Sequence, residues 1–445
     1  MSELTNTEEI SAGSLWRRWE PHVHAPGTIF NNQFKGGDAW DRYLTALEQA
    51  SPEIEAIAVT DYYCTDTYRR VVEEKTNGRL PRVKLIFPNI EMRLDVATVK
   101  GRWANVHLLI SPEDPDHLVE IERFLGRLRF EAHGDKFSCT RADLTALGRK
   151  ADSRLADDGT AFRHGASQFK VGFCQLRDEF AKSDWAKANI LIAVAGSETD
   201  GTSGVREAAD ATLRQEVEKF AHVIFASSSA QREFWLGCRS GMTEAQLRER
   251  YNGCKPCLHG SDAHDHDAVA APAGDRFSWV KGDLHFDTLR QAYIDPAGRA
   301  FVGASPPSAA IPSQIISNIG ISGATWAKTP RIPLNPGLVA VIGARGSGKT
   351  ALMDMIAAGC DALPRRSARA ADGPSASLSS AQQSFWAMLR SRSRGRPVGS
   401  KRAGSIGRTM MVGVHRGRVT CRSSLSRSSA RPAVSPMRCC VKSNG

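Results

Sequence analysis

The stretch Trp19-Glu20-Pro21-His22-Val23-His24 decides how the rest of this chain is interpreted. Its two histidines stand at positions i and i+2 of a predicted strand, so both side chains leave the same face of that strand. Where the strand ends, they can offer two imidazole nitrogens to one metal ion, and imidazole suits zinc, iron or nickel. On their own, two histidines in a strand favour an ordinary structural role, so the interpretation depends on the residues farther along the chain.

Further imidazoles and carboxylates stand at, or just after, short apolar runs. They are Asp61, Glu91, His107, Asp262 and His264. The set contains no cysteine and suits about two divalent cations of the zinc, manganese or iron kind. Ligands that gather at the ends of successive strands are typical of an α/β barrel active site.

Apolar runs and helical periodicity alternate over the first 300 or so residues. Strands are predicted at 17–24, 54–60, 83–91, 105–110, 190–195, 222–226, 257–259 and 300–303. Helices are predicted at 38–50, 65–74, 115–130, 141–150, 174–187, 204–216, 229–237, 243–250 and 287–294. This alternation predicts an α/β fold, either a parallel barrel or a doubly wound sheet.

The bulk properties narrow the class of protein. The 445 residues suffice for two or three domains. The N-terminus lacks the basic and apolar regions of a signal peptide, and no apolar run reaches the length of a membrane span, so we expect no membrane and a cytoplasmic location. The ten cysteines have no framework spacing, which favours reduced thiols. Cys254 and Cys257 form only half of a zinc-ribbon pattern.

The net charge of +11 is unevenly distributed. Residues 362–445 contain 17 Lys+Arg and one acid, whereas residues 1–361 contain 42 basic and 47 acidic residues. The basic charge therefore belongs to the last 84 residues and is no evidence that the folded part binds nucleic acid.

A phosphate-binding loop is predicted near residue 343. The apolar run 338–342 leads into Gly343-Ala344-Arg345-Gly346-Ser347-Gly348-Lys349-Thr350, and a helical stretch, 351–358, comes next. This order of strand, G-x-x-x-x-G-K-[ST] and helix is the context that a P-loop requires. In such a loop Gly343, Gly346 and Gly348 let the backbone wrap a phosphate, Lys349 meets the β and γ oxygens of ATP, and Thr350 ligates Mg²⁺.

The P-loop unit is nevertheless incomplete. No later apolar run ends in Asp-Glu, as a Walker B strand would. We therefore expect residues 1–15 to be a leader, 16–303 the metal-binding domain, 304–336 a linker rich in proline, and 337–361 only the start of an ATPase.

Taken together, these motifs resemble the PHP superfamily (polymerase and histidinol phosphatase), whose members are metal-dependent phosphoesterases on a distorted (β/α)7 barrel. The matching pieces are His22-Val23-His24, Thr60-Asp61, Ile90-Glu91, His107 and Ser261-Asp262-Ala263-His264, in the family's order. The P-loop near residue 343 resembles the TrlF-type fusions of a PHP domain with an ABC/SMC-like ATPase. In two places the sequence departs from the family: Tyr62 stands where a histidine usually comes after the aspartate, and Phe30-Asn31-Asn32 offers no histidine or aspartate.

The resemblance implies a phosphoesterase with nucleic acid as an expected substrate. It implies Glu91 as the carboxylate that bridges two metals, and His264 or His107 as a metal ligand or proton source. It also implies a homo-oligomer formed through the ATPase part in the full-length family. Two other hypotheses remain open: a barrel with an eroded site that serves as scaffold or regulator of an ATPase, and a P-loop ATPase whose first half is a sensor.

The composition of residues 362–445 changes abruptly. Of these 84 residues, 55 are Arg, Ser, Ala, Gly or Pro and only 12 are Leu, Ile, Val or Phe, which predicts a disordered basic tail. One interpretation is a natural arm that binds nucleic acid. The other is a frameshift near residue 361, because translation of GC-rich DNA in another frame gives this composition.

Overall fold

The structure, a computed structural model, describes residues 12–205, 207–226, 228–239, 241–307, 315–322, 331–359, 408–415 and 418–424. The chain divides into two compact units, one of Leu15–Pro307 and the other of Met1–Ser14 with Ser308–Gly445. Within the described ranges, no helix combines the length and the apolar character needed to span a bilayer.

The first unit is built around a nine-stranded sheet, in the order β11-β10-β1-β2-β3-β4-β7-β8-β9. The strands are β1 (Trp16–His24), β2 (Ala56–Tyr62), β3 (Leu85–Ala97), β4 (Trp103–Ile110), β7 (Ile190–Ala195), β8 (Val223–Phe225), β9 (Cys257–Leu258), β10 (Phe277–Lys281) and β11 (Ala300–Gly303). Pairs β1–β2, β2–β3, β7–β8 and β8–β9 are parallel, and the other four are antiparallel.

The sheet curls until its two ends nearly meet. The main chain just after β9 is tied to β10 by one hydroxyl: His259 N donates to Ser278 Oγ at 2.7 Å, and Ser278 Oγ donates to His259 O at 2.8 Å. The predicted α/β barrel is therefore confirmed as a nearly closed, mixed sheet. The antiparallel pairs around β4 and β10 are its departures from a regular (β/α) barrel.

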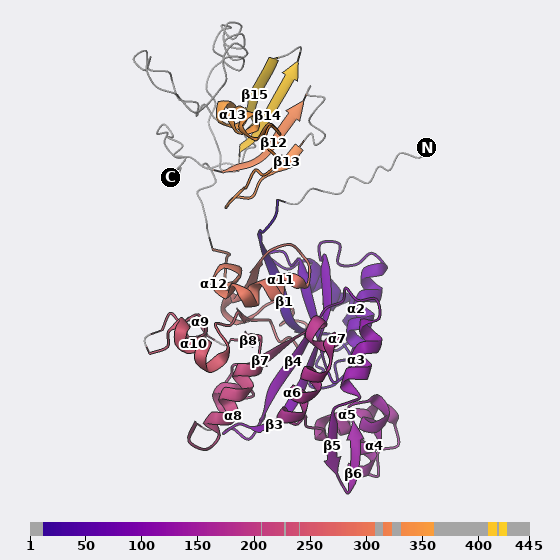
Figure 1. Cartoon of the computed structure of the whole chain (residues 1–445). Helices are drawn as coiled ribbons and strands as arrows, with labels where there is room; N and C mark the ends of the chain where they lie inside the picture. Colours follow the sequence, from indigo (N-terminus) through magenta and orange to yellow (C-terminus); the bar gives the residue numbers. More distant parts are fainter. Residues whose placement is uncertain are drawn as a thin grey trace. The chain divides into compact units, whose positions relative to one another are not determined.

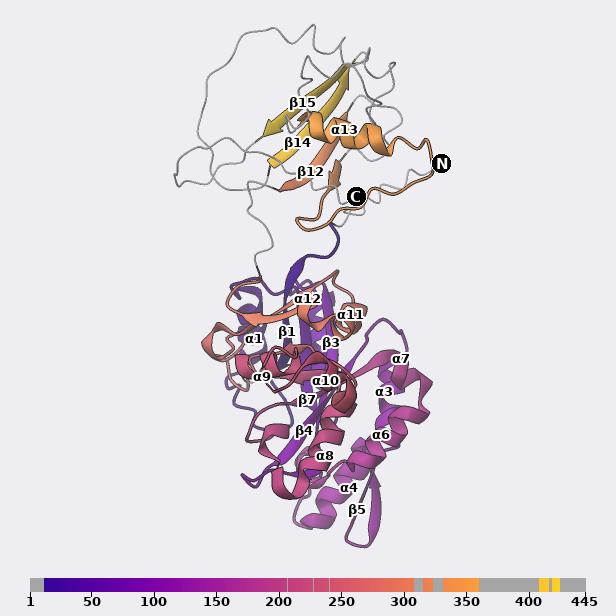
Figure 2. The same cartoon turned by 60° about the vertical axis from the view of Figure 1, so that its left-hand side comes forward.

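Helices cover the outside of this sheet (Figures 1 and 2). They are α1 (Ala39–Glu48), α2 (Asp66–Thr76), α3 (His117–Leu125), α4 (Arg141–Ala151), α5 (Asp158–Gln168), α6 (Phe173–Lys182), α7 (Asp184–Asn189), α8 (Glu207–Phe220), α9 (Ser229–Trp235), α10 (Glu244–Tyr251), α11 (Asp287–Ile294) and α12 (Pro296–Arg299). Helices α4 and α5, with the hairpin of β5 (Arg129–Ala132) and β6 (Asp135–Ser138), form a lobe at one end of the unit in both views.

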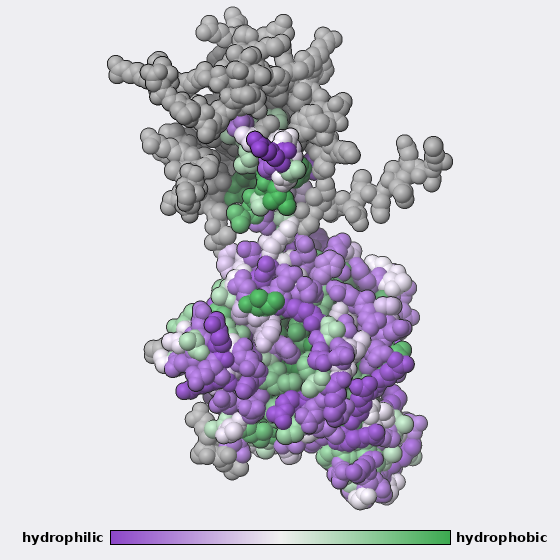
Figure 3. Space-filling model, in the orientation of Figure 1, coloured by the Kyte–Doolittle hydropathy of each residue, from purple (hydrophilic) through white to green (hydrophobic). Residues whose placement is uncertain are grey.

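Two apolar layers hold the barrel. The interior is filled by one cluster with members on almost every strand, among them Trp19, Phe87, Leu109 and Phe225, which are at most 8 % exposed. The outer face of the strands packs against the helices in two further clusters. On the face drawn in Figure 3, apolar residues of this unit gather near the middle and hydrophilic residues surround them.

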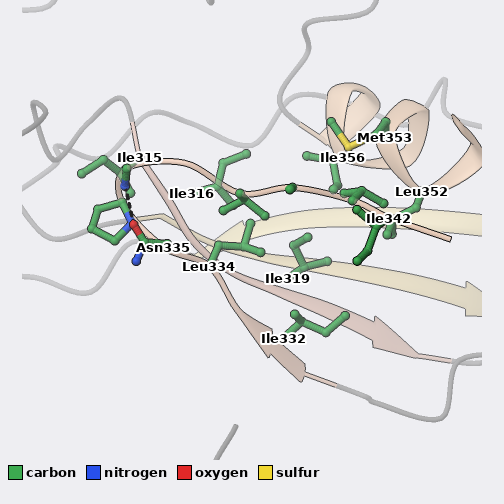
Figure 4. A pocket seen from close by; sticks show the side chains of 15 residues that line it. Ile315, Ile316, Ile319, Ile332, Leu334, Asn335, Ile342, Leu352, Met353 and Ile356 are labelled. Atoms are coloured by element: carbon green, nitrogen blue, oxygen red, sulfur yellow. Dashed lines mark hydrogen bonds between the residues drawn. The ribbon is translucent and has the colours of Figure 1, made fainter. Parts of the chain in front are cut away.

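The second unit contains a smaller sheet in the order β13-β12-β14-β15. Its strands are β12 (Ile316–Ser322), β13 (Arg331–Pro333), β14 (Arg408–His415) and β15 (Arg418–Ser424), and its helix is α13 (Lys349–Gly359). A pocket of about 520 Å³ lies among apolar side chains of this unit, including Ile316, Ile319, Leu334, Leu352 and Ile356 (Figure 4).

The second unit contains strands in two ranges where none were expected. The range expected to be a linker contains β12 and β13, because Ile316, Ile319 and Ile321 form a β-branched run. The range expected to be a disordered tail contains β14 and β15, because Met410–Val414 is a short apolar run that can pair with β12. The rest of that tail lies outside the described residues, so its disorder and its frameshift origin stay predictions.

The predicted strand at 338–342 is not formed. These residues have no strand partner, and Leu338 and Ile342 are 89 % and 88 % exposed. A strand is stable only beside neighbours that pair with its backbone, and no described segment pairs with this one. The helix predicted after the loop does form, as α13.

Candidate metal centre

The two histidines of the opening motif lie at the end of β1. The pairing of β1 with β2 shifts register between Glu20 and Val23, so Pro21, which has no N–H, and His22 stand in a bulge. Both imidazoles nevertheless point to one spot, with Nε2 of His22 and Nε2 of His24 3.3 Å apart.

Two carboxylates complete this group. Glu91 Oε2 lies 3.4 Å from the Nε2 atom of each histidine. Asp262 Oδ1 lies 3.2 Å from His22 Nε2 and 3.5 Å from His24 Nε2. We call these four residues, His22, His24, Glu91 and Asp262, the ligand cluster.

The spacing of the cluster fits a divalent cation. Zn–N and Zn–O bonds are about 2.0–2.2 Å, and the corners of a tetrahedron of that radius lie about 3.3–3.6 Å apart. The Nε2 atoms of His22 and His24 and Oε2 of Glu91 lie 3.3–3.4 Å from one another, which matches one face of such a tetrahedron. Asp262 Oδ1 lies 3.2 and 3.5 Å from the same two imidazole nitrogens. Moreover, Glu91 Oε2 is buried without a hydrogen-bond partner among the described residues. Two imidazoles and two carboxylates converging in this way are the donors that a divalent cation requires.

Hydrogen bonds of Thr28 and Asp61, on the side of His24 away from the cluster, determine the tautomer of His24. Thr28 Oγ1 donates its single proton to Asp61 Oδ1 at 3.2 Å, so it must accept the contact from His24 Nδ1 at 3.1 Å. His24 therefore carries its proton on Nδ1 and presents the lone pair of Nε2 to the cluster, as a metal ligand must.

Asp61, which we predicted as a metal ligand, is not among the converging atoms. Its Oδ1 accepts from Thr28, from the main-chain N–H of Ile29 at 3.0 Å and from that of Tyr62 at 2.8 Å. Its Oδ2 accepts from Thr67 Oγ1 at 3.0 Å. In this structure the carboxylate orients His24 and holds a loop to β2.

His107 lies directly opposite Glu91 in the antiparallel pair β3–β4. Its ring is edge-on to that of His22, with centroids 4.7 Å apart, but its nitrogens are not part of the tight cluster. Its Nδ1 donates to Asn89 Oδ1 at 3.1 Å, because the amide group of Asn89 already donates to Pro21 O at 3.2 Å and to Thr60 Oγ1 at 3.0 Å.

His264 stands beside the cluster on the loop after Asp262. It can join a second group of converging atoms with His24 and Asp262. Its Nδ1 donates to Asp262 O at 2.9 Å, and its Nε2 is buried without a hydrogen-bond partner among the described residues. This lone pair suits either a second cation or a proton.

Charge in the cluster is strongly coupled. Burial opposes protonation of His24, but Asp262 and Glu91 outweigh it and raise its pKa to about 9. Burial favours the neutral form of Glu91, yet the imidazoles of His22 and His24, whose own pKa values are raised, hold the pKa of Glu91 well below the usual range. Burial lowers the pKa of His107 to about 3, so this imidazole is neutral. The site thus keeps ionised carboxylates beside imidazoles, and a cation can replace the protons on the latter.

The loop that carries Asp262 is held tightly to β1. Asp262 has a left-handed backbone, with φ of 50°, and its N–H donates to His22 O at 2.9 Å. Ser261 N donates to Glu20 Oε1 at 2.7 Å. A Cβ atom on Gly260 would lie 2.6 Å from His22 O, so only glycine allows this approach.

A cavity of about 1080 Å³ opens from the cluster. Its wall includes Phe30, Tyr62, Arg93, Trp103 and Asn105. Asn105 Nδ2 donates to Glu91 Oε1 at 2.6 Å. Four residues of the site, Glu20, Thr28, Asn89 and Asn105, were not predicted from the sequence. Asn89 and Asn105 each stand two residues before a predicted ligand and therefore on the same face of the strand, and this spacing could have indicated them.

In the predicted P-loop, the lysine is hydrogen-bonded to the loop itself. Lys349 Nζ donates to Gly343 O at 2.8 Å and to Ala344 O at 2.9 Å, which are carbonyls of its own loop. Gly346 and Gly348 have positive φ, as the turn requires, and Thr350 lies in the first turn of α13.

Comparison with known proteins adds little. No protein-family model and no curated protein matches this chain. Among solved structures it is similar to a protein from Bifidobacterium adolescentis provisionally named a metal-dependent phosphoesterase, with 13 % identity and a TM-score of 0.29, over 64 % of this chain and 96 % of that one. A likeness at this level supports no inference about activity, so the function depends on the side chains described above.

Proposed function

We propose that this chain is a divalent-metal-dependent phosphoesterase. The observation that carries the proposal is the ligand cluster, in which Glu91 Oε2 and Asp262 Oδ1 each lie 3.2–3.5 Å from the Nε2 atoms of His22 and His24, beside a cavity of about 1080 Å³. A divalent cation bound there supplies a Lewis acid for a phosphoryl oxygen and a water of lowered pKa.

The residues have distinct roles in this proposal. His22, His24 and Asp262 would hold one cation, and Glu91 would be the carboxylate shared with a second. His107, which is neutral and fixed by Asn89, would offer Nε2 to that second cation. His264 Nε2 has a free lone pair and can accept the proton of an attacking water.

We further propose nucleic acid as the substrate class. The cavity is open and far larger than a phosphate group, and its wall carries the rings of Phe30, Tyr62 and Trp103. Trp103 is 39 % exposed, which is unusual for this residue type and suits stacking on a base. Coupling to an ATPase stays a proposal supported only by the P-loop motif and α13.

The test combines metal content with hydrolysis. Purified full-length chain should contain about two transition ions, and the His22→Ala/His24→Ala double variant should lose at least one of them. With Mn²⁺, the parent should cleave bis-p-nitrophenyl phosphate and a single-stranded oligonucleotide slowly. Glu91→Gln should reduce both rates to background, whereas Glu249→Gln, an exposed control on α10, should change neither.

Two outcomes would contradict the proposal. Equal metal content in the parent and the double variant would exclude the ligand cluster as the metal-binding site. Well under one ion per chain in the parent would favour the eroded scaffold. Cleavage of the small diester without cleavage of the oligonucleotide would contradict only the substrate class.

A further inference from the structure

A single arginine lies beside the ligand cluster on the same strand as Glu91. Glu91 and Arg93 are two residues apart on β3, and the residues that alternate with them, Met92 and Leu94, are buried in the outer core. Side chains two apart in a strand leave the same face, so Arg93 shares the cavity with Glu91.

The guanidinium of Arg93 has no ion pair. Among the described residues, no carboxylate lies within salt-bridge distance of it and no side-chain hydrogen bond engages it, although the cavity wall also carries Glu91, Asp200 and Asp262. Most other partly buried arginines of this unit, such as Arg79 on Glu48, are paired. A cation left unpaired in a polar cavity is typical of a site whose anion arrives with the ligand.

The side chain is nevertheless held in place. The guanidinium carbon of Arg93 lies 4.7 Å from the centre of the Phe30 ring. Phe30 contacts Tyr62, with centroids 4.5 Å apart, and Tyr62 stacks on His24 at 5.0 Å with 15° between the planes. A continuous column of planar groups therefore runs from a cluster ligand to Arg93, and it fixes the guanidinium beside the cluster.

The charge of the cavity wall supplies the reason for such a cation. The wall carries three carboxylates, on Glu91, Asp200 and Asp262, so an anionic phosphate that enters the cavity meets negative charge beside the bound cations. Arg93 adds an uncompensated positive charge and up to five donors on the same side of the sheet. Its planar fork matches two phosphate oxygens.

We propose that Arg93, held on Phe30, is an anion-binding residue that receives the phosphate oxygens of the substrate not bound to metal. This inference rests on the proposed function for the identity of the substrate, but the anion site itself does not need turnover. The ligand chemistry is a phosphate mono- or dianion.

The experiment measures binding of inorganic phosphate to the full-length, Mn²⁺-loaded protein by isothermal titration calorimetry. Arg93→Met, which keeps the apolar stem on Phe30, should weaken phosphate binding at least tenfold, and Arg93→Lys should lie between it and the parent. Arg177→Met is the matched control, because Arg177 also lies over a phenylalanine, Phe173, but outside the cavity and paired with Glu216. Metal content, by elemental analysis, should stay the same in all four proteins.

Affinity of Arg93→Met within twofold of the parent would overturn the inference, as would a parent that binds no phosphate with or without metal. If Arg93→Met does not fold, two other variants replace it: Arg93→Lys, and Phe30→Leu, which removes the ring and keeps the charge. Phosphate affinity within twofold of the parent in both of them would then overturn the inference. Phosphate binding that depends on Arg93 in a protein without esterase activity would contradict the proposed function and leave the anion site standing. Esterase activity that phosphate inhibits equally well in the parent and in Arg93→Met would contradict the anion site and leave the proposed function standing.

Discussion

Asn89 joins its own strand to three other strands of the site. Its amide donates to the main chain of Pro21 in β1 and to Thr60 in β2, and its oxygen accepts from His107 in β4. One buried side chain on β3 thus ties together the neighbouring strands and fixes one imidazole. Partners behind metal-binding histidines commonly contribute as much as a ligand does.

We therefore expect Asn89→Ala to release the ring of His107. In the metal-free parent, ¹⁵N NMR should show His107 protonated on Nδ1, because Asn89 Oδ1 is an acceptor; the variant should show a mixture of tautomers. Metal affinity should fall by about 10–100-fold. Asn77→Ala, at the exposed end of α2, is the control for loss of an asparagine. An unchanged tautomer in Asn89→Ala would show that another group orients the ring.

At the scale of elements, the site is formed where the loop after β9 meets the end of β1. Gly260 allows the two backbones to touch, Glu20 and His22 accept the next two N–H groups, and Asp262 is thereby turned toward the histidines. The left-handed conformation of Asp262 costs on the order of 1–3 kcal/mol, which these contacts must offset.

Gly260→Ala should accordingly separate Asp262 from the cluster. The added Cβ would meet His22 at 2.6 Å, so the loop has to move. We expect metal binding weakened at least about tenfold, because one of four ligands is displaced, while the far-UV circular dichroism stays close to that of the parent. Gly37→Ala, where a Cβ meets nothing within 4 Å, should behave as the parent does. Full metal affinity in Gly260→Ala would mean that Asp262 is dispensable.

At the scale of the whole molecule, the two units differ in completeness. The barrel encloses its own core and presents a formed cavity. The second unit leaves the apolar run 338–342 without a strand partner among the described residues, and Lys349 is bonded to the carbonyls of its own loop. A nucleotide needs a lysine free to meet phosphate and a sheet that supports the loop.

We expect this 445-residue chain to bind ATP weakly and to hydrolyse it negligibly. Lys349→Ala should remove whatever binding exists, and it should leave the metal content and the cleavage of bis-p-nitrophenyl phosphate unchanged. Equilibrium dialysis with ATP and a phosphate-release assay measure the two properties. Robust ATP turnover that depends on Lys349 would show that the second unit completes an ATPase in solution.

The sequence by itself determined the alternation of strands and helices and the identity of the four cluster residues, because ligands at strand ends and apolar runs are local signals. It missed β10 and α5. The β10 strand, which helps to close the barrel through Ser278, is only five residues long, and two of these residues, Ser278 and Lys281, are polar. The α5 helix carries three glycines or alanines in its middle and is held by close backbone contact with α4.

Only the tertiary structure decided which polar residues face the cluster and which stand behind it. Asp61 and Asp262 are both carboxylates near strand ends, but the first is surrounded by N–H and O–H donors and the second faces two imidazoles. The difference arises because long-range packing, such as the approach of Gly260 to His22, sets which oxygen meets which partner, and no local pattern encodes that approach.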